Sequence, residues 1–170
     1  MYTESTTLQH GPGSNYSYVC GGGHDEIIAL SIIDLFQFPF DDGIANQVGD
    51  LSGSRTFLSA NNSSVHGYVC GGWSGSFDLS TIDRFQFPFG RGTAYQVGNL
   101  CGSRTFLSAN NSSPHGYVCG GWNISNFEHS TIDRFQFPFD NGTASHVSNL
   151  SGSRDTLSAT GGVDFVTMFV

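Results

Sequence analysis

The strongest constraint on the fold is a repeat, because nearly the same stretch of sequence occurs three times, about fifty residues apart. The segment Tyr-Val-Cys-Gly-Gly recurs with its cysteine at Cys20, Cys70 and Cys119. An acid that opens Asp-x-Phe-Gln-Phe-Pro-Phe recurs at Asp34, Asp83 and Asp133, and an arginine that closes Gly-Ser-Arg recurs at Arg55, Arg104 and Arg154. Such a period is typical of an array of similar units, each of which leaves an apolar face that a neighbour covers. Residues present in every unit are therefore more easily explained by packing than by a reaction performed once.

The composition favours short strands and narrows the classes of partner. The 170 residues include 15 Phe and 23 Gly, and frequent aromatics and turn residues are typical of short strands with tight connections. The formal net charge is −8 and all six basic residues are Arg, which argues against nucleic-acid binding. No apolar run approaches the roughly 18 to 20 residues that span a bilayer, so membrane insertion is not expected. The first residues lack a basic start and an apolar core, so they predict no secretion signal.

The middle repeat predicts four short strands. They cover residues 56–60, 66–70, 81–89 and 93–100, with a turn at Asn61 to Ser64 and a variable loop from Trp73 to Ser80. We expect one repeat domain over residues 1–170, with units at about 6–55, 56–104 and 105–154 and a half unit at 155–170. Four short antiparallel strands per unit, repeated, describe the blades of a β-propeller. The predicted class is all-β, with about three and a half four-stranded blades.

The order of these features resembles the kelch repeat. An arginine turn precedes the first strand (Arg55), a double glycine follows a Tyr-Val strand (Gly71-Gly72), and an aromatic third strand comes next (Ile82 to Phe89). The pattern departs from the family at the third strand, which normally leads to a Trp, whereas Trp73 and Trp122 here follow the double glycine. The repeat also resembles kelch-type repeats in structural and tail proteins of aquatic tailed bacteriophages. The resemblance lies in the sequence Val-Gly-Asn-Leu-x-Gly-Ser-Arg, followed by Ser-Ser-x-His-Gly-Tyr-Val-x-Gly-Gly.

Three and a half blades are fewer than the four to eight that close a propeller. Two chains pairing as half-rings, an open stack of units in a fibre or virion, and a fragment of a longer array are the three alternatives. The pairing of half-rings, into a ring of seven or eight blades, is the preferred one. The apolar end Phe165 to Val170 resembles an exposed strand edge, so we expect a homo-oligomer that associates through terminal strands.

The recurring acids and arginines predict structural ion pairs, within or between blades, in preference to a ring of catalytic groups. The residues concerned are Asp34, Asp83, Asp133, Arg55, Arg104 and Arg154. The cysteines predict free thiols in a reducing compartment, because equivalent positions in a stack lie too far apart for a disulfide. No metal site, cofactor or catalytic residue is expected, because no spacing typical of zinc ligands and no nucleophile motif occurs.

The variable loop is the expected place for binding, since it carries aromatics on a repeated scaffold. Its candidate ligand-binding residues are Trp73, Phe77, Trp122 and Phe127, which either stack on a sugar or a partner protein or cap the adjacent blade. Asn62 and Asn111 are possible glycosylation sites, because the repeat puts them in an expected surface loop.

These features predict a non-enzymatic structural or binding protein. The preferred setting is a bacteriophage virion, assembled in the host cytoplasm, in which the protein is tail-associated or on the surface and contacts other virion proteins or a host surface glycan. The alternative is a subunit of an extracellular, glycosylated filament or surface layer. A carbohydrate-active enzyme is a third class, without support from individual residues.

Overall fold

The computed structural model describes residues 6–9, 15–24, 28–125 and 127–161, and for 6–9 the backbone alone. The fold is all-β and consists of small antiparallel sheets. Three of them have four strands, and each is formed within one repeat. The first has the order β1-β2-β5-β6, the second β7-β8-β9-β10 and the third β11-β12-β15-β16. The expected unit boundaries at 55, 104 and 154 fall in the connections that follow these sheets.

The strand bounds repeat from sheet to sheet. The first sheet contains β1 (Thr6–Gln9), β2 (Tyr16–Cys20), β5 (Ile32–Gln37) and β6 (Asn46–Asp50). The second contains β7 (Ser59–Asn62), β8 (His66–Cys70), β9 (Thr81–Gln86) and β10 (Tyr95–Asn99). The third contains β11 (Ser108–Asn111), β12 (His115–Cys119), β15 (Thr131–Gln136) and β16 (Ser145–Asn149). Two short hairpins complete the fold: β3 (Gly23–His24) with β4 (Ile28–Ala29), and β13 (Trp122–Asn123) with β14 (Phe127–Glu128).

The register is the same in all three sheets. Cys70 lies opposite Ser59 on one side and Ile82 on the other, and Cys20 and Cys119 have the matching partners in their own sheets. The third and fourth strands of each sheet also share one irregularity in the ladder, which lies between Ile33 and Asp34, between Ile82 and Asp83, and between Ile132 and Asp133. The repeated sequence therefore forms the same strand register in each sheet.

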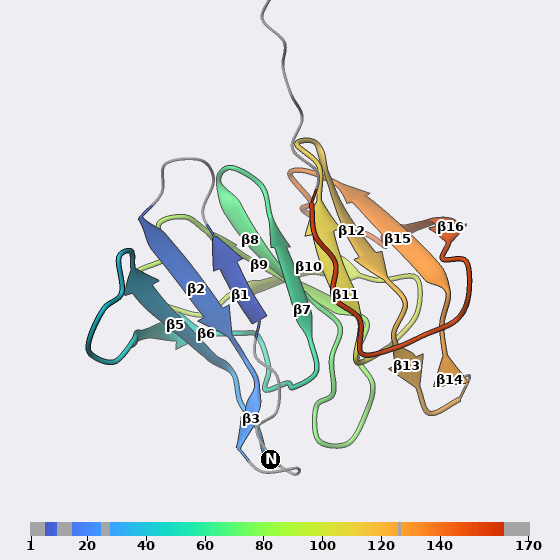
Figure 1. Ribbon diagram of the computed structural model, residues 1–170, viewed down its shortest axis with the longest axis horizontal. Coiled ribbons are helices and arrows are strands. Elements are labelled where there is room, and N and C mark those ends of the chain that lie inside the picture. The colour runs from blue at the N-terminus through green and yellow to red at the C-terminus, as the bar shows by residue number, and fades with distance from the viewer. Residues whose placement is uncertain (1–5, 10–14, 25–27, 126, 162–170) are drawn as a thin grey trace, which may run out of the picture.

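The three sheets stand side by side in chain order (Figure 1). Their first strands β1, β7 and β11 lie toward the middle of the row, with β7 in contact with both of the others. The first and third sheets lie at opposite ends, and the described strands do not close into a ring. The sheets thus form an open row with two free ends.

Two apolar clusters hold the row together, one at each junction between neighbouring sheets. The first joins Tyr18 and Ile33 of the first sheet to Val69 and Phe85 of the second. The second joins Tyr68 and Ile82 of the second sheet to Val118, Phe135 and other residues of the third. Burial of such side chains is worth about 1.5–3 kcal/mol each, so packing between sheets is a main source of stability.

The structure corrects three expectations about local structure. Asn61 and Asn62 were expected in a turn but form the second half of β7, where Asn61 Nδ2 donates to the carbonyl oxygen of Asn110, 3.1 Å away in the next unit. The expected strand 81–89 ends at Gln86, before Pro88, which has no N–H to donate to a ladder. The variable loop of the third unit contains the hairpin β13–β14, which the polar sequence did not predict.

The expected terminal half unit is described only in part. Residues 155–161 continue the chain past the third sheet, and within the described part no strand pairing is recorded for them. The segment Phe165 to Val170, on which association through terminal strands was expected, lies outside the described residues.

Candidate functional site

The most deeply buried charged groups among the described residues are the recurring acids and arginines of the second and third units. Arg55 is 1 % exposed and Asp83 is 0 % exposed, and Nη2 of Arg55 lies 2.7 Å from Oδ2 of Asp83. Asp83 also accepts hydrogen bonds from the backbone N–H of Ser52 (2.8 Å) and from its hydroxyl (2.7 Å). The arginine comes from the connection between two sheets and the acid from β9, so the pair fastens the connection to the sheet that follows it.

The third unit repeats this arrangement with one residue replaced by another. Nη2 of Arg104 lies 2.8 Å from Oδ2 of Asp133, and the backbone N–H of Cys101 donates to the same oxygen over 3.0 Å. Cys101 stands where the second unit has Ser52, and its thiol donates to Oδ1 of Asp133. A thiol is a weaker donor than a hydroxyl, so this copy of the cluster is the less tightly bonded one.

The other two predicted members of this set have no such partner. Asp34 occupies the equivalent place in the first sheet, but no Arg or Lys precedes it in the sequence. Arg154 follows the third sheet and is exposed, whereas Arg55 and Arg104 are buried. No ion pair of Asp34 or Arg154 is found among residues 6–9, 15–24, 28–125 and 127–161. Burial raises the pKa of the Asp34 carboxyl, which has lost hydration without gaining a cation.

The chemistry of the clusters is that of closed structural sites. Each carboxylate is neutralised by a guanidinium and accepts further hydrogen bonds from the preceding turn, while Nε of Arg104 is buried without a hydrogen-bond partner among the described residues. The thiols nearby are also unreactive, because burial raises the pKa of Cys70 to about 12 and that of Cys20 further. Within the described residues the four cysteines are free; Cys20 and Cys70 are buried, Cys119 is half-buried and Cys101 is exposed.

The predicted binding residues lie together at one end of the sheets, but they differ in exposure. Phe77 is 71 % exposed and Phe127 is 63 % exposed. Trp73 and Trp122 are half-buried, and their backbones pair with Thr56 and Thr105 in the connections that precede the same sheets. Phe77 and Phe127 are therefore available to a ligand, whereas each tryptophan also anchors the base of its loop.

A contact between neighbouring loops, which the sequence did not indicate, joins these residues into one surface. The backbone N–H of Ile124 donates to Oδ2 of Asp78 over 3.0 Å, which ties the loop of the third unit to that of the second. Ile124 is itself 70 % exposed, and Ile28 of the hairpin β3–β4 in the first unit is 54 % exposed. We call the surface that these two loops form the loop rim; it consists of Phe77, Ile124 and Phe127. The hairpin β13–β14 shows where the rim lies in the fold (Figure 1).

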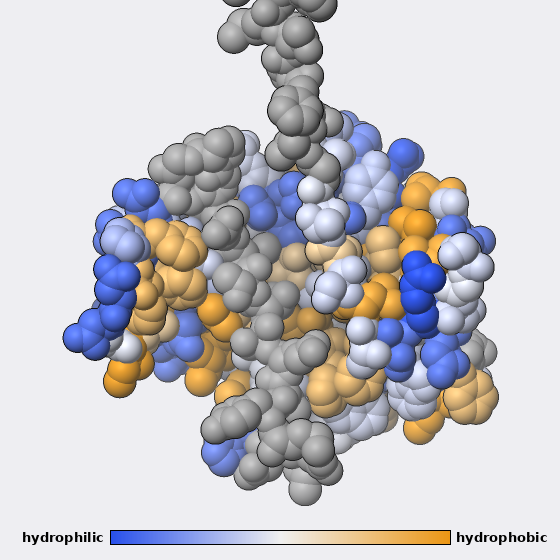
Figure 2. All heavy atoms as spheres, viewed as in Figure 1, coloured by the Kyte–Doolittle hydropathy of each residue, from blue (hydrophilic) through white to orange (hydrophobic). Residues whose placement is uncertain are grey.

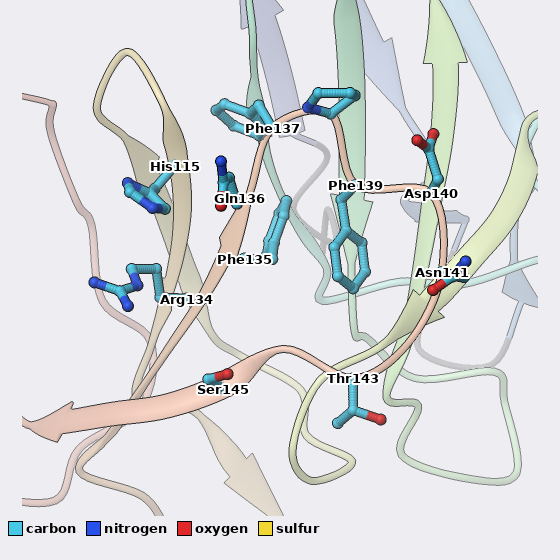
Figure 3. Close-up of a pocket in the computed structure, with 11 residues that line it drawn as sticks. His115, Arg134, Phe135, Gln136, Phe137, Phe139, Asp140, Asn141, Thr143 and Ser145 are labelled. Carbon is cyan, nitrogen blue, oxygen red and sulfur yellow. The ribbon is translucent and has the colours of Figure 1, made fainter.

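Two hollows of equivalent position lie beside the Phe-Gln-Phe-Pro-Phe segments. The one in the third unit has a volume of about 540 Å³, and the chain from Arg134 to Ser145 curls around it (Figure 3). The one in the second unit, about 340 Å³, is lined by the equivalent stretch from Phe85 to Tyr95. The hollow in the third unit is lined by Asp140, where the hollow in the second unit has Gly90. Asp140 forms an ion pair with Arg84 of the second sheet. Because the hollows recur with the repeat, they are more simply explained by the shared backbone than by a single catalytic cleft.

The expected glycosylation sites lie elsewhere than expected. Asn62 and Asn111 are the last residues of β7 and β11, in the innermost strands, and both are half-buried. The amide of Asn62 donates to the carbonyl oxygen of Ser63 over 3.1 Å. The sequence placed them in a surface loop because Asn-Asn-Ser-Ser has the composition of a turn, and the structure corrects that placement.

Among the described residues, no three His, Cys, Asp or Glu side chains cluster closely enough to hold a metal ion. The same part of the chain contains no helix with the length and apolar character needed to cross a membrane.

Comparison with known proteins leaves the site to be interpreted from its own geometry. No model of a protein family matches the chain, and no curated protein matches it.

Proposed function

We propose that this protein is a non-enzymatic structural and binding protein, built of kelch-like blades that are completed into a β-propeller by association with copies of itself. The observation that carries the proposal is the free end at each side of the row of sheets. Phe38 (36 % exposed) and Phe40 (45 %) lie in the first unit, whereas their equivalents Phe87 and Phe89 in the second unit are buried and half-buried. Apolar surface is visible at both ends of the molecule (Figure 2). Exposed apolar side chains at both ends support an interface at each end.

The number of sheets supports the same reading. A chain with three four-stranded sheets has fewer blades than a propeller needs, since propellers close with about four to eight. Two copies supply six, and three copies already exceed that range. The count therefore favours a ring of two chains with six blades, one or two fewer than the sequence suggested, because the terminal half unit forms no sheet of its own among the described residues.

We place this assembly in a bacteriophage virion, as a tail-associated or surface protein made in the host cytoplasm. The support is the resemblance of the repeat to those of phage structural proteins, together with the closed structural chemistry of the buried clusters. The expected partners are further copies and other virion proteins, without cofactor, nucleic acid or membrane insertion. The loop rim is the surface on which a host glycan would bind, because exposed aromatic rings stack on sugar rings.

A subunit of an extracellular filament or surface layer is the second candidate. Its support is the difference between the two free ends, since head-to-tail contacts that do not close a ring build filaments. The half-buried positions of Asn62 and Asn111 make the glycosylated form of this candidate the weaker one.

Electron microscopy of the purified protein separates the candidates. We expect closed rings of uniform diameter, and we expect the protein to co-purify with capsid and tail proteins from phage particles. Long helical filaments of the protein alone would support the second candidate instead. A population of single chains would contradict both.

The role of the loop rim is tested by binding to immobilised surface glycans. We expect Phe77→Ser and Phe127→Ser to weaken binding strongly while the assembly stays intact. Val65→Ser is the matched control, because Val65 is 50 % exposed and lies in the turn at the opposite end of β8. Equal binding by all three variants, or none by the unchanged protein, would remove the glycan from the proposal.

A further inference from the structure

The contact between neighbouring sheets is built twice from the same parts. At the first junction the Tyr18 ring lies 5.2 Å from that of Phe87, and the Tyr18 hydroxyl oxygen accepts a hydrogen bond from the backbone N–H of Phe89 over 2.9 Å. At the second junction the Tyr68 ring lies 5.0 Å from that of Phe137, and its hydroxyl accepts from the N–H of Phe139 over 3.1 Å. One sheet supplies a tyrosine, and the next sheet supplies the Phe-Pro-Phe turn.

The two ends of the row each hold one unused half of this junction. The third sheet presents Tyr117, which is half-buried, whereas Tyr18 and Tyr68 are 2 % and 0 % exposed. The first sheet presents the turn with Phe38 and Phe40, both exposed. The two halves are complementary and not identical. A second copy of the chain can therefore supply the Phe-Pro-Phe turn to the end with Tyr117, and the tyrosine to the end with Phe38 and Phe40.

The charges at the two ends are complementary in the same sense. Within the chain, Arg104 pairs with Asp133 of the following sheet, and Arg84 pairs with Asp140 of the following sheet. Arg154, which follows the third sheet, is the equivalent of Arg104, and Arg134, in the third sheet, is the equivalent of Arg84. Both Arg154 and Arg134 are exposed. The equivalent acids of the first sheet are Asp34, half-buried, and Asp41, exposed. One end therefore carries the two cations of a junction, and the other end carries its two anions.

We propose that the third sheet of one copy binds the first sheet of a second copy, with Arg154 pairing with Asp34 and Arg134 with Asp41 across the contact. This inference rests on the self-assembly in the proposed function and specifies its interface. The Tyr117 ring of one copy then lies against Phe38 and Phe40 of the other. Repeated at the opposite ends, the same contact closes two chains into a ring.

The segment that follows Arg154 is already placed for this contact. The N–H of Gly121 donates to the carbonyl oxygen of Arg154 over 3.0 Å, as Gly22 does to Arg55 and Gly72 to Arg104. Residues 158–161 thus stand where β7 and β11 stand in the second and third sheets, in the place of an innermost strand. In the contact they pair with β2 of the incoming copy, whose own β1 gives up that place. Each copy thus donates a strand to the first sheet of the other copy.

Ser148 sets the strength of the contact. Its equivalents are Gly49 and Gly98, where an added Cβ would lie 2.6 Å from a ring carbon of Phe89 or Phe139 and closer still to a backbone carbonyl oxygen of the next sheet. A serine at this place holds the two copies apart at their outer strands, so the contact between copies is weaker than the two within the chain. We expect Ser148→Gly to tighten the association, with a dissociation constant lower by roughly tenfold or more.

The test is complementation between two variants of the full chain, measured by light scattering coupled to size-exclusion chromatography. We expect the unchanged protein to have the mass of two chains. Arg154→Ala and Asp34→Asn should each shift the protein to the mass of one chain. An equimolar mixture of the two variants should recover the mass of two chains, because one of its contacts keeps both Arg154 and Asp34.

Matched measurements keep the result interpretable. Arg91→Ala removes another exposed arginine and should keep the mass of two chains. Circular dichroism should show the same β-sheet signal for every variant. If both variants keep the mass of two chains, or if their mixture stays at one, this interface is wrong while self-assembly stands. If the unchanged protein has the mass of one chain, the interface and the proposed assembly both fail.

Discussion

At the scale of single residues, the buried ion pairs are the part of the structure most sensitive to substitution. Arg55 with Asp83, and Arg104 with Asp133, are within 1 % of complete burial. A charge left there without its partner has neither water nor a counter-ion, which costs about 3–5 kcal/mol. That is a large share of the roughly 5–15 kcal/mol by which a domain is stable.

We therefore expect Asp83→Asn and Arg104→Ala each to lower the free energy of unfolding by about 3–5 kcal/mol in urea titrations. Arg91→Ala, at an exposed position, should stay within about 0.5 kcal/mol of the unchanged protein. If Asp83→Asn and Arg104→Ala both left the midpoint unchanged, the pairs would not hold the connections to the sheets.

A second prediction at this scale concerns pH. Burial, followed by the charge of Arg104, lowers the pKa of His129 below its usual 6.5. Nδ2 of Asn123 lies 2.9 Å from its Nε2, which suits an unprotonated, accepting nitrogen. The folded chain then binds this proton less readily than the unfolded chain, so stability falls as the pH drops below about 6.5.

The measurement is urea unfolding between about pH 7.5 and pH 5.5, a range that lies above the usual titration of carboxyl groups. We expect the free energy of unfolding to decrease across it, and we expect His129→Gln to reduce that decrease. The pKa of His66 is also lowered by burial, so part of the slope should persist in the variant. A slope that His129→Gln leaves unchanged would rule out the assignment to this histidine.

At the scale of elements, the strands followed from the sequence and the contacts between sheets did not. The strand His66–Cys70 was predicted to the residue, since a Tyr-Val core bounded by glycines leaves little freedom. The pairing of Arg55 with Asp83 and of Arg104 with Asp133 also followed from their common period, whereas Asp34 and Arg154 form no such pair among the described residues. The contacts of Asn61 with Asn110, Ile124 with Asp78 and Arg84 with Asp140 were not predicted. They join residues about fifty apart, and only the placement of neighbouring sheets brings those together.

The same limit applies to the candidate site. The sequence identified Phe77 and Phe127 from the variability of their loop, but it left open whether Trp73 and Trp122 bind a ligand or cap the adjacent blade. The structure separates them, because the backbone of each tryptophan forms a bridge to the connection before its sheet. Exposure of a side chain depends on what the neighbouring unit covers, which a repeat pattern does not state.

A prediction at this scale tests how closely neighbouring sheets approach. A Cβ at Gly98 would lie 2.6 Å from Cε1 of Phe139 and closer still to the carbonyl oxygen of Gly142, so Gly98→Ala should cost about 1–3 kcal/mol in urea unfolding. Gly102→Ala is the control, because nothing lies within 4 Å of its Cβ position. Equal stability of both variants would mean that the sheets are less tightly packed at their outer strands.

At the scale of the whole molecule, the two end sheets expose side chains that their equivalents bury at the internal junctions. The row of sheets therefore resembles one part of a larger assembly. Each internal junction buries a tyrosine and an arginine–acid pair and packs a Phe-Pro-Phe turn against them, and each end of the row shows half of that set. The repeat predicted that units need neighbours of their own kind. The three full units were also predicted from the sequence, whereas the side chains left exposed at the two ends came only from the structure.

The most direct measurement is a disulfide placed across the contact between copies. Asn99 and Thr143 form a backbone bridge between the second and third sheets, and their equivalents at the free ends are Asn149 and Ile44. In a chain carrying Cys101→Ser, oxidised Asn99→Cys/Thr143→Cys should close a bond within one chain. Oxidised Asn149→Cys/Ile44→Cys should instead run as two covalently linked chains on a non-reducing gel. If the first pair closes and the second leaves single chains, the ends of this protein do not meet one another.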